Sequence, residues 1–162
     1  MGQLLIVALC ILILLTDTEE NGIAGGILFL IGTMLAGIAA VGRMWCSLYI
    51  SGYKKDVLIT AGPYSMSRNP LYFFSLLGTA GVGLATRTVT IPVIAVSAFI
   101  LYYPVVIRRE EERLTRIHGK KFEEYCKKVP RFIPSFSLFS EPEEYIIKPK
   151  YLRRRLTDSL WY

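Results

Sequence analysis

The chain alternates between long apolar runs and short polar connectors. Four apolar runs cover residues 4–15, 23–41, 72–85 and 89–107. A helix needs about 20 predominantly apolar residues to cross a bilayer, and the first and third runs reach that length only with interfacial residues. Each run is joined to a neighbour by a tight connector. The pattern therefore predicts an all-α integral membrane protein with about four transmembrane helices, arranged as two hairpins.

Composition supports the same class. Hydrophobic residues make up 52% of the chain and its mean hydropathy is +0.41, both higher than in an ordinary soluble domain. We expect one membrane domain over residues 1–162, with two helices in 1–53, a site and two further helices in 54–134, and a basic tail in 135–162. A signal peptide at the start is the disfavoured alternative, because no basic segment precedes the first run and no small-x-small cleavage site follows it.

Basic residues are distributed unevenly among the connectors. The first connector, 17–21, is acidic, whereas the second carries Arg43, Lys54, Lys55 and Arg68, and the tail is rich in Lys and Arg. This asymmetry predicts that both termini and the polar segments of the second half are cytoplasmic, in a prokaryotic inner membrane or the endoplasmic reticulum. Basic flanks that contact anionic membrane lipids account for the net charge of +6, so no nucleic-acid partner is expected.

Residues 54–69 form a polar, turn-rich connector, which we expect to be a structured loop. Gly62-Pro63 and Asn69-Pro70 both discourage helix there. Pro70 suits the first turn of the third membrane helix, so Arg68 and Asn69 would lie at its N-terminal end, where free N–H groups favour an anionic ligand group. The alternative is that Arg68 only reaches lipid phosphates.

An amphipathic helix follows the last apolar run. At about 100° per residue, Glu110 and Glu111 straddle the centre of its apolar stripe, and Glu112 points away. Carboxylates that face the protein need a cation, which could be Arg68, Arg131 or a cationic cofactor. An internal ion pair without a catalytic role is the alternative.

The remainder of the chain continues this cytoplasmic part. Gly119 predicts a break before a further helix over 120–128, and residues 129–134 form an extended strip from which Arg131 could reach a carboxylate. An interfacial amphipathic helix is expected over 152–160. The three cysteines have no spacing typical of a metal site or a disulfide framework, so no metal is expected. His118, a lone histidine on an apolar face, is expected to pack rather than to act as a base.

Small residues recur in the second apolar run. Their pattern is the one that lets membrane helices approach closely, so we expect them to pack against another helix. The glycines concerned are Gly25, Gly26, Gly32, Gly37 and Gly42.

Two motifs together resemble a known family. The first motif consists of Gly62-Pro63-Tyr64 and Arg68-Asn69-Pro70-Leu71-Tyr72. The second consists of Glu110-Glu111, Leu114, Gly119, Phe122, Tyr125 and Val129-Pro130-Arg131-Phe132-Ile133-Pro134. Over about residues 43–134 the chain resembles the isoprenylcysteine carboxyl methyltransferase family, to whose broader group phospholipid N-methyltransferases belong. The resemblance implies a helical membrane enzyme that binds S-adenosylmethionine at the cytoplasmic face.

The resemblance also implies roles for individual residues. Glu111 would hold the amino group of the methionine moiety. Asn69 stands where the family usually has histidine, and asparagine donates a hydrogen bond but does not titrate. Gly37-Ile38-Ala39 matches the family's Gly-x-Gly imperfectly. The implied catalytic residues are Arg68, Asn69, Glu111 and Arg131, and the implied cofactor-binding residues are Tyr64, Arg68, Asn69, Pro70, Tyr72, Glu110, Glu111 and Tyr125.

Methyl transfer from a sulfonium is an in-line displacement in which the protein mainly supplies positioning and excludes water. The acceptor would be lipophilic and present a carboxylate, amine or thiol. No titratable group is visibly poised as a base, which favours an acceptor that is already nucleophilic. Two alternatives are an NADPH-dependent membrane reductase of the sterol-reductase type and a non-catalytic membrane scaffold.

Overall fold

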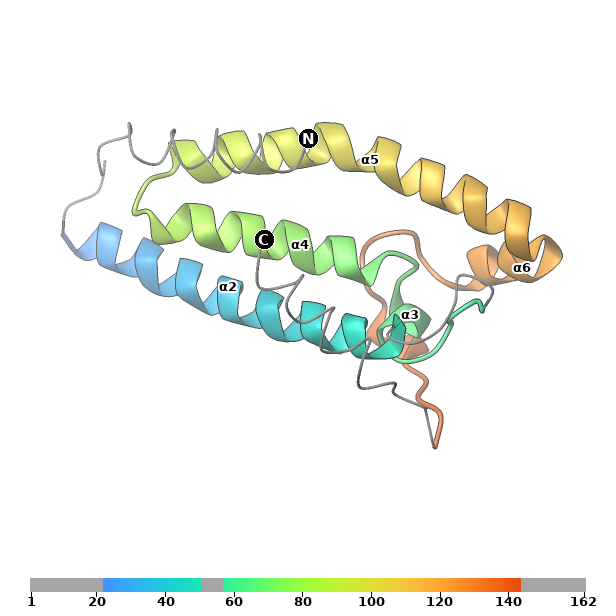
Figure 1. Ribbon diagram of the computed structural model, residues 1–162. Coiled ribbons are helices and arrows are strands. Elements are labelled where there is room, and N and C mark those ends of the chain that lie inside the picture. The colour runs from blue at the N-terminus through green and yellow to red at the C-terminus, as the bar shows by residue number, and fades with distance from the viewer. Residues whose placement is uncertain (1–21, 51–56, 144–162) are drawn as a thin grey trace. The chain divides into compact units, whose positions relative to one another are not determined.

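A computed structural model describes residues 22–50 and 57–143. In these ranges the chain is helical and has no β-strand, which confirms the predicted all-α class (Figure 1). The elements are α2 (Ile23–Ile50), α3 (Pro63–Met66), α4 (Pro70–Ala85), α5 (Thr90–His118), α6 (Lys120–Lys128) and the 3₁₀ helix η1 (Phe136–Leu138).

The apolar helices agree with a membrane protein. Among the described residues, α2 and α5 are long and apolar enough to cross a bilayer, whereas α4 has 16 residues. The first predicted run, 4–15, and the predicted interfacial helix at 152–160 lie outside the described residues. The expected total of about four spans therefore stays a prediction.

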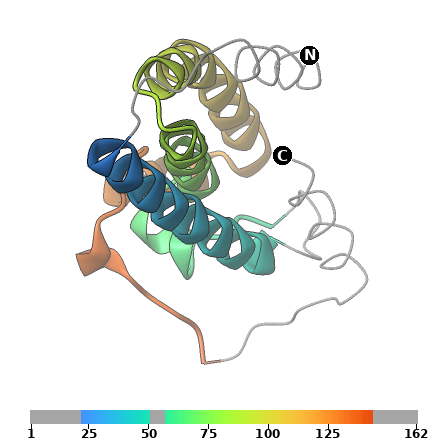
Figure 2. The ribbon, with the colours of Figure 1, turned by 90° about the vertical axis from the view of Figure 1, so that its left-hand side faces the viewer.

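Two compact units divide the described chain. The first consists of residues up to 40 and 75–102, and the second of 41–74 and 103–143. In the first unit α2 and α4 lie side by side, with backbone packed against backbone (Figures 1 and 2). A Cβ atom at Gly32 would overlap the backbone of Gly81 and Ala85, whereas one at Gly37 would meet no atom of the described residues within 4 Å. The predicted small-residue packing is confirmed at Gly32 but not at Gly37.

The second unit carries the polar segments. Its core contains the buried side chains of Phe122, Tyr125 and Val129, against which Leu58 and Leu114 pack. The helix break at Gly119 is confirmed: this glycine has φ +52°, which ends α5 and lets α6 begin in a new direction.

One expectation about the connector is wrong. Gly62-Pro63 was expected to discourage helix, yet Pro63 begins the one-turn helix α3. The physical reason is that the first position of a helix needs no N–H donor and suits the fixed φ of proline. Gly62 precedes it with φ +60°, a conformation that favours glycine. The expected start of the next helix at Pro70 is confirmed.

Candidate functional site

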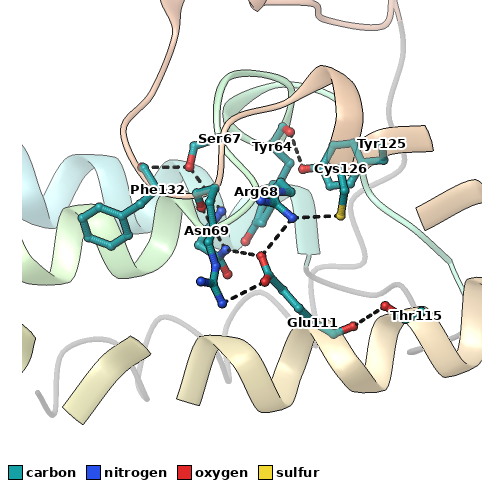
Figure 3. A network of polar contacts seen from close by, with 10 residues as sticks. Tyr64, Ser67, Arg68, Asn69, Glu111, Thr115, Tyr125, Cys126 and Phe132 are labelled. Atoms are coloured by element: carbon teal, nitrogen blue, oxygen red, sulfur yellow. Dashed lines mark hydrogen bonds and ion pairs between the residues drawn. The ribbon is translucent and has the colours of Figure 1, made fainter. Parts of the chain in front are cut away.

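The side chain of Glu111 on α5 is the centre of a polar network in the second unit (Figure 3). Arg68 Nη1 lies 3.2 Å from its Oε1, and Arg131 Nη2 lies 3.0 Å from its Oε2. Asn69 Nδ2 donates a longer hydrogen bond, 3.3 Å, to Oε1. The Glu111 and Arg68 side chains are each 16% exposed. The structure therefore brings together the four residues predicted to be catalytic, and Glu111 meets both arginines that the sequence offered as partners.

Two guanidinium groups against one carboxylate give this cluster a single net positive charge. Arg68 also has a spare donor, because its Nε is buried and has no hydrogen-bond partner among the described residues. Arg68 Nη1 lies 2.8 Å from Cys126 Sγ, a contact that the sequence reasoning missed. A net positive cluster with a spare N–H is suited to an anionic ligand group.

Asn69 links the connector to the extended strip. Its buried Nδ2 donates to the backbone oxygen of Arg131 at 2.9 Å as well as to Glu111. Pro70, which is also buried, starts α4 directly after it. Asn69 thus has a structural hydrogen-bonding role in the cluster, and its amide does not titrate.

A cavity of about 370 Å³ lies beside the cluster. This volume is within the usual range of small-molecule sites. The residues predicted to bind a cofactor line it, except Pro70; they are Tyr64, Arg68, Asn69, Tyr72, Glu110, Glu111 and Tyr125. Further lining residues that the sequence reasoning did not assign include Leu58, Arg113, Leu114, Ile117 and Phe122. Arg131 contacts Glu111 but does not line the cavity.

Two tyrosines are fixed at the cavity wall. The Tyr72 hydroxyl donates to Glu110 Oε2 at 2.8 Å, and the Tyr125 hydroxyl donates to the backbone oxygen of Tyr64 at 2.6 Å. Burial raises the pKa of the Tyr125 phenol above its usual value, so this group remains a protonated donor further into alkaline solution than an exposed tyrosine would.

Glu110 and Arg113 are the exposed charged residues of the cavity wall. They are three positions apart on α5, so they lie on neighbouring parts of one helix surface. Glu110 is held by Tyr72, whereas Arg113 forms no ion pair within residues 22–50 and 57–143. The wall therefore offers one carboxylate and one uncompensated guanidinium group. No group of three or more His, Cys, Asp or Glu side chains in the described part of the chain could hold a metal ion.

Comparisons with known proteins found a matching family model and two curated relatives. The family model described as phospholipid methyltransferase matches residues 20–121. The chain is 42% identical over 135 residues to the nickel-cobalt-cadmium resistance protein NccN of Alcaligenes xylosoxydans xylosoxydans, a match that covers 83% of this chain and 63% of the relative. It is 38% identical over 136 residues to the cobalt-zinc-cadmium resistance protein CzcN of Cupriavidus metallidurans, covering 84% and 62%. The chain thus spans about three fifths of the length of these curated relatives. No solved structure matches it.

Proposed function

Because the chain belongs to the phospholipid methyltransferase family, we propose that it transfers a methyl group from S-adenosylmethionine to a lipophilic acceptor at the cytoplasmic membrane face. Family membership supports methyl transfer in general. The observation that carries the finer proposal is the cluster of Arg68, Arg131 and Glu111 beside a cavity of about 370 Å³.

The charges of the cavity wall fit the methionine end of S-adenosylmethionine, which carries a carboxylate, an ammonium and a sulfonium group. Arg68, with its spare Nε in a net positive cluster, suits the carboxylate. Glu110 suits the ammonium group. Tyr64 and Tyr72 also line the cavity, and a cation over a tyrosine ring gains up to about 2 kcal/mol in a desolvated site.

Charge balance refines one role that the family resemblance implies. The resemblance implies that the amino group of the methionine moiety is held by Glu111, and we propose a different role for this residue. Its two carboxylate oxygens already face Arg68 and Arg131, at 3.2 and 3.0 Å. Glu110 has no guanidinium partner among the described residues, so we assign the ammonium group to Glu110. Glu111 then orients the two arginines.

When bound, S-adenosylmethionine supplies a methyl group on positively charged sulfur, so the protein needs only to bind, orient and exclude water. Asn69 has no titratable group, and a tyrosine phenol such as that of Tyr125 is protonated at neutral pH. Neither can deprotonate an amine. An acceptor that is already nucleophilic, such as a carboxylate or thiolate, fits this wall best, and the uncompensated Arg113 favours an acceptor with an anionic group.

The two curated relatives are named as resistance proteins, one for nickel, cobalt and cadmium and the other for cobalt, zinc and cadmium. We propose that methyl transfer by this chain modifies a membrane component in cells exposed to such ions. A strain that lacks the protein would be complemented with the wild type or with Glu111→Gln and grown in cadmium, cobalt or nickel salts. Tolerance restored by the wild type alone would support the proposal, and equal tolerance with both would contradict it.

Cofactor binding is the direct test of the proposed chemistry. The purified protein in detergent would be titrated calorimetrically with S-adenosylmethionine, S-adenosylhomocysteine and NADPH, and the titrations repeated with Glu111→Gln. Glu112→Gln is the matched control, because Glu112 is the next residue on α5 and pairs with Arg108 on the surface. We expect saturable binding of both adenosyl ligands, which is lost in Glu111→Gln and kept in Glu112→Gln. Binding of NADPH alone would favour a reductase, and binding of none of them would favour a scaffold.

A further inference from the structure

Residues 130–141, which we call the strap, run along the connector that carries Arg68 and Asn69. The family model ends at residue 121, so the strap lies beyond the region it matches. Of the strap residues, Arg131 alone was expected to act in the site. The structure instead joins the strap to the connector by a series of backbone hydrogen bonds.

The first part of the strap holds the end of the connector nearest the cluster. The backbone N–H of Arg68 donates to the oxygen of Pro130 at 2.9 Å. Ser67 Oγ donates to the oxygen of Phe132 at 2.9 Å, a contact drawn in Figure 3. These bonds fix the backbone from which the Arg68 side chain extends towards Glu111.

The last part of the strap holds the beginning of α3. The N–H of Gly62 donates to the oxygen of Ser140 at 2.8 Å, and the N–H of Ser140 donates to Ser65 Oγ at 2.9 Å. Ser65 Oγ in turn donates to the oxygen of Gly62 at 2.7 Å. The turn that presents Tyr64 to the cavity is therefore closed by the strap.

Tyr49 and Glu141 anchor this far end. The buried Tyr49 hydroxyl donates a short hydrogen bond to Glu141 Oε1, directly after Ser140. The Tyr49 ring also lies against Gly62, where any Cβ atom would overlap it. Tyr49 thus touches both the strap and the turn that the strap holds. Neither Tyr49 nor Glu141 lines the cavity.

We infer that Tyr49 and Glu141 are positioning residues of the proposed cofactor site: they dock the strap, and the docked strap holds the backbone of Tyr64 and Arg68 in the geometry that binds the cofactor. This inference rests on the proposed function. Because linkage is reciprocal, a ligand that binds only the docked form must also stabilise docking. Bound S-adenosylhomocysteine should therefore protect the strap, although Glu141 does not line the cavity.

The test compares Glu141→Ala, Glu141→Gln and Tyr49→Phe with the wild type. Glu143→Ala is the matched control, because Glu143 is an exposed carboxylate two residues further along and forms no ion pair among the described residues. Affinity for S-adenosylhomocysteine is measured by calorimetry. Hydrogen exchange of the Gly62, Ser135 and Ser140 amides is followed with and without the ligand.

We expect Glu141→Ala and Tyr49→Phe to weaken S-adenosylhomocysteine binding about tenfold, the loss typical of one hydrogen bond. Glu141→Gln keeps an acceptor oxygen and should bind nearly as well as the wild type, and Glu143→Ala should not differ from it. The ligand should slow exchange of the Ser140 amide in the wild type. Undiminished affinity in both Glu141→Ala and Tyr49→Phe, or no protection of Ser140, would overturn the inference alone. Absence of binding by the wild type would instead overturn the proposed function.

Discussion

Glu111 and Glu112 offer a comparison within one helix. Each carboxylate pairs with arginine at almost the same distance, Glu111 with Arg131 at 3.0 Å and Glu112 with Arg108 at 3.1 Å. Their burial differs: the Glu111 side chain is 16% exposed and that of Glu112 is 55% exposed. Replacing each glutamate by glutamine therefore changes charge and shape in the same way but in different surroundings.

The expected losses follow from that difference. An exposed pair contributes about 0.2–1 kcal/mol, and removal of one partner from a fully buried pair costs about 3–5 kcal/mol. Glu111 is close to the buried limit, but glutamine keeps one acceptor oxygen for Arg68 or Arg131. We expect Glu111→Gln to lower the free energy of unfolding by about 2–4 kcal/mol and Glu112→Gln by at most about 0.5 kcal/mol.

The assay is equilibrium unfolding in mixed micelles with increasing dodecyl sulfate, followed by circular dichroism. The Glu112→Gln loss should also vanish at high salt, because exposed charges are screened, whereas most of the Glu111→Gln loss should remain. Equal losses for the two variants, or a Glu111→Gln loss that salt abolishes, would refute the reasoning that burial of the cluster sets its energy.

Three further predictions concern other parts of the chain. Arg113→Gln should raise the KM for a phosphate- or carboxylate-bearing lipid about tenfold and leave the affinity for S-adenosylhomocysteine unchanged. The KM is measured from the transfer of labelled methyl groups to synthetic charged and neutral lipids. Because the pKa of Tyr125 is raised, its protonated phenol stabilises the folded state fully below about pH 10, and this stabilisation is lost as the pH rises further. The free energy of unfolding of Tyr125→Phe should therefore depend less on pH above 10 than that of the wild type, although the variant lacks the hydrogen bond to Tyr64. Gly32→Ala should lower the unfolding free energy by about 1–3 kcal/mol through overlap with the α4 backbone, whereas Gly37→Ala, with open space in the described structure, should be neutral or slightly stabilising; thermal unfolding of the two variants in detergent decides it.

The sequence predicted those features that depend on local chemistry. Gly119 predicted the break that separates α5 from α6, because the conformational preference of glycine is a property of the residue itself. The carboxylate of Glu111 was expected to meet a cation because its face of the helix is apolar. The residues near Glu111 in the sequence could not predict which cation it meets, because Arg68 and Arg131 are 43 and 20 positions away.

Other features depend on tertiary contacts that have no sequence signal. The strap binds mainly through backbone atoms, which every residue possesses, so nothing in residues 135–141 distinguished it. The contact between Arg68 and Cys126 required α6 to pack beneath the connector. At Pro63 the expectation was wrong because proline disfavours the interior of a helix but is favoured at its first position, where Pro63 lies.

The order in which the site's parts occur along the chain has a consequence for folding. The contacts that tie α6 and the strap to residues 49–69 join positions 58 to 92 apart, from Arg68 with Cys126 to Tyr49 with Glu141. Such distant contacts close large loops and form late, after local helices. During synthesis, α2, α4 and α5 are made before the strap exists. A nascent chain that stops short of residue 130 would contain Glu111 and Arg68 but not Arg131, so the cluster would lack its net positive charge. Cofactor binding would thus begin only when the last part of the site has been made and docked.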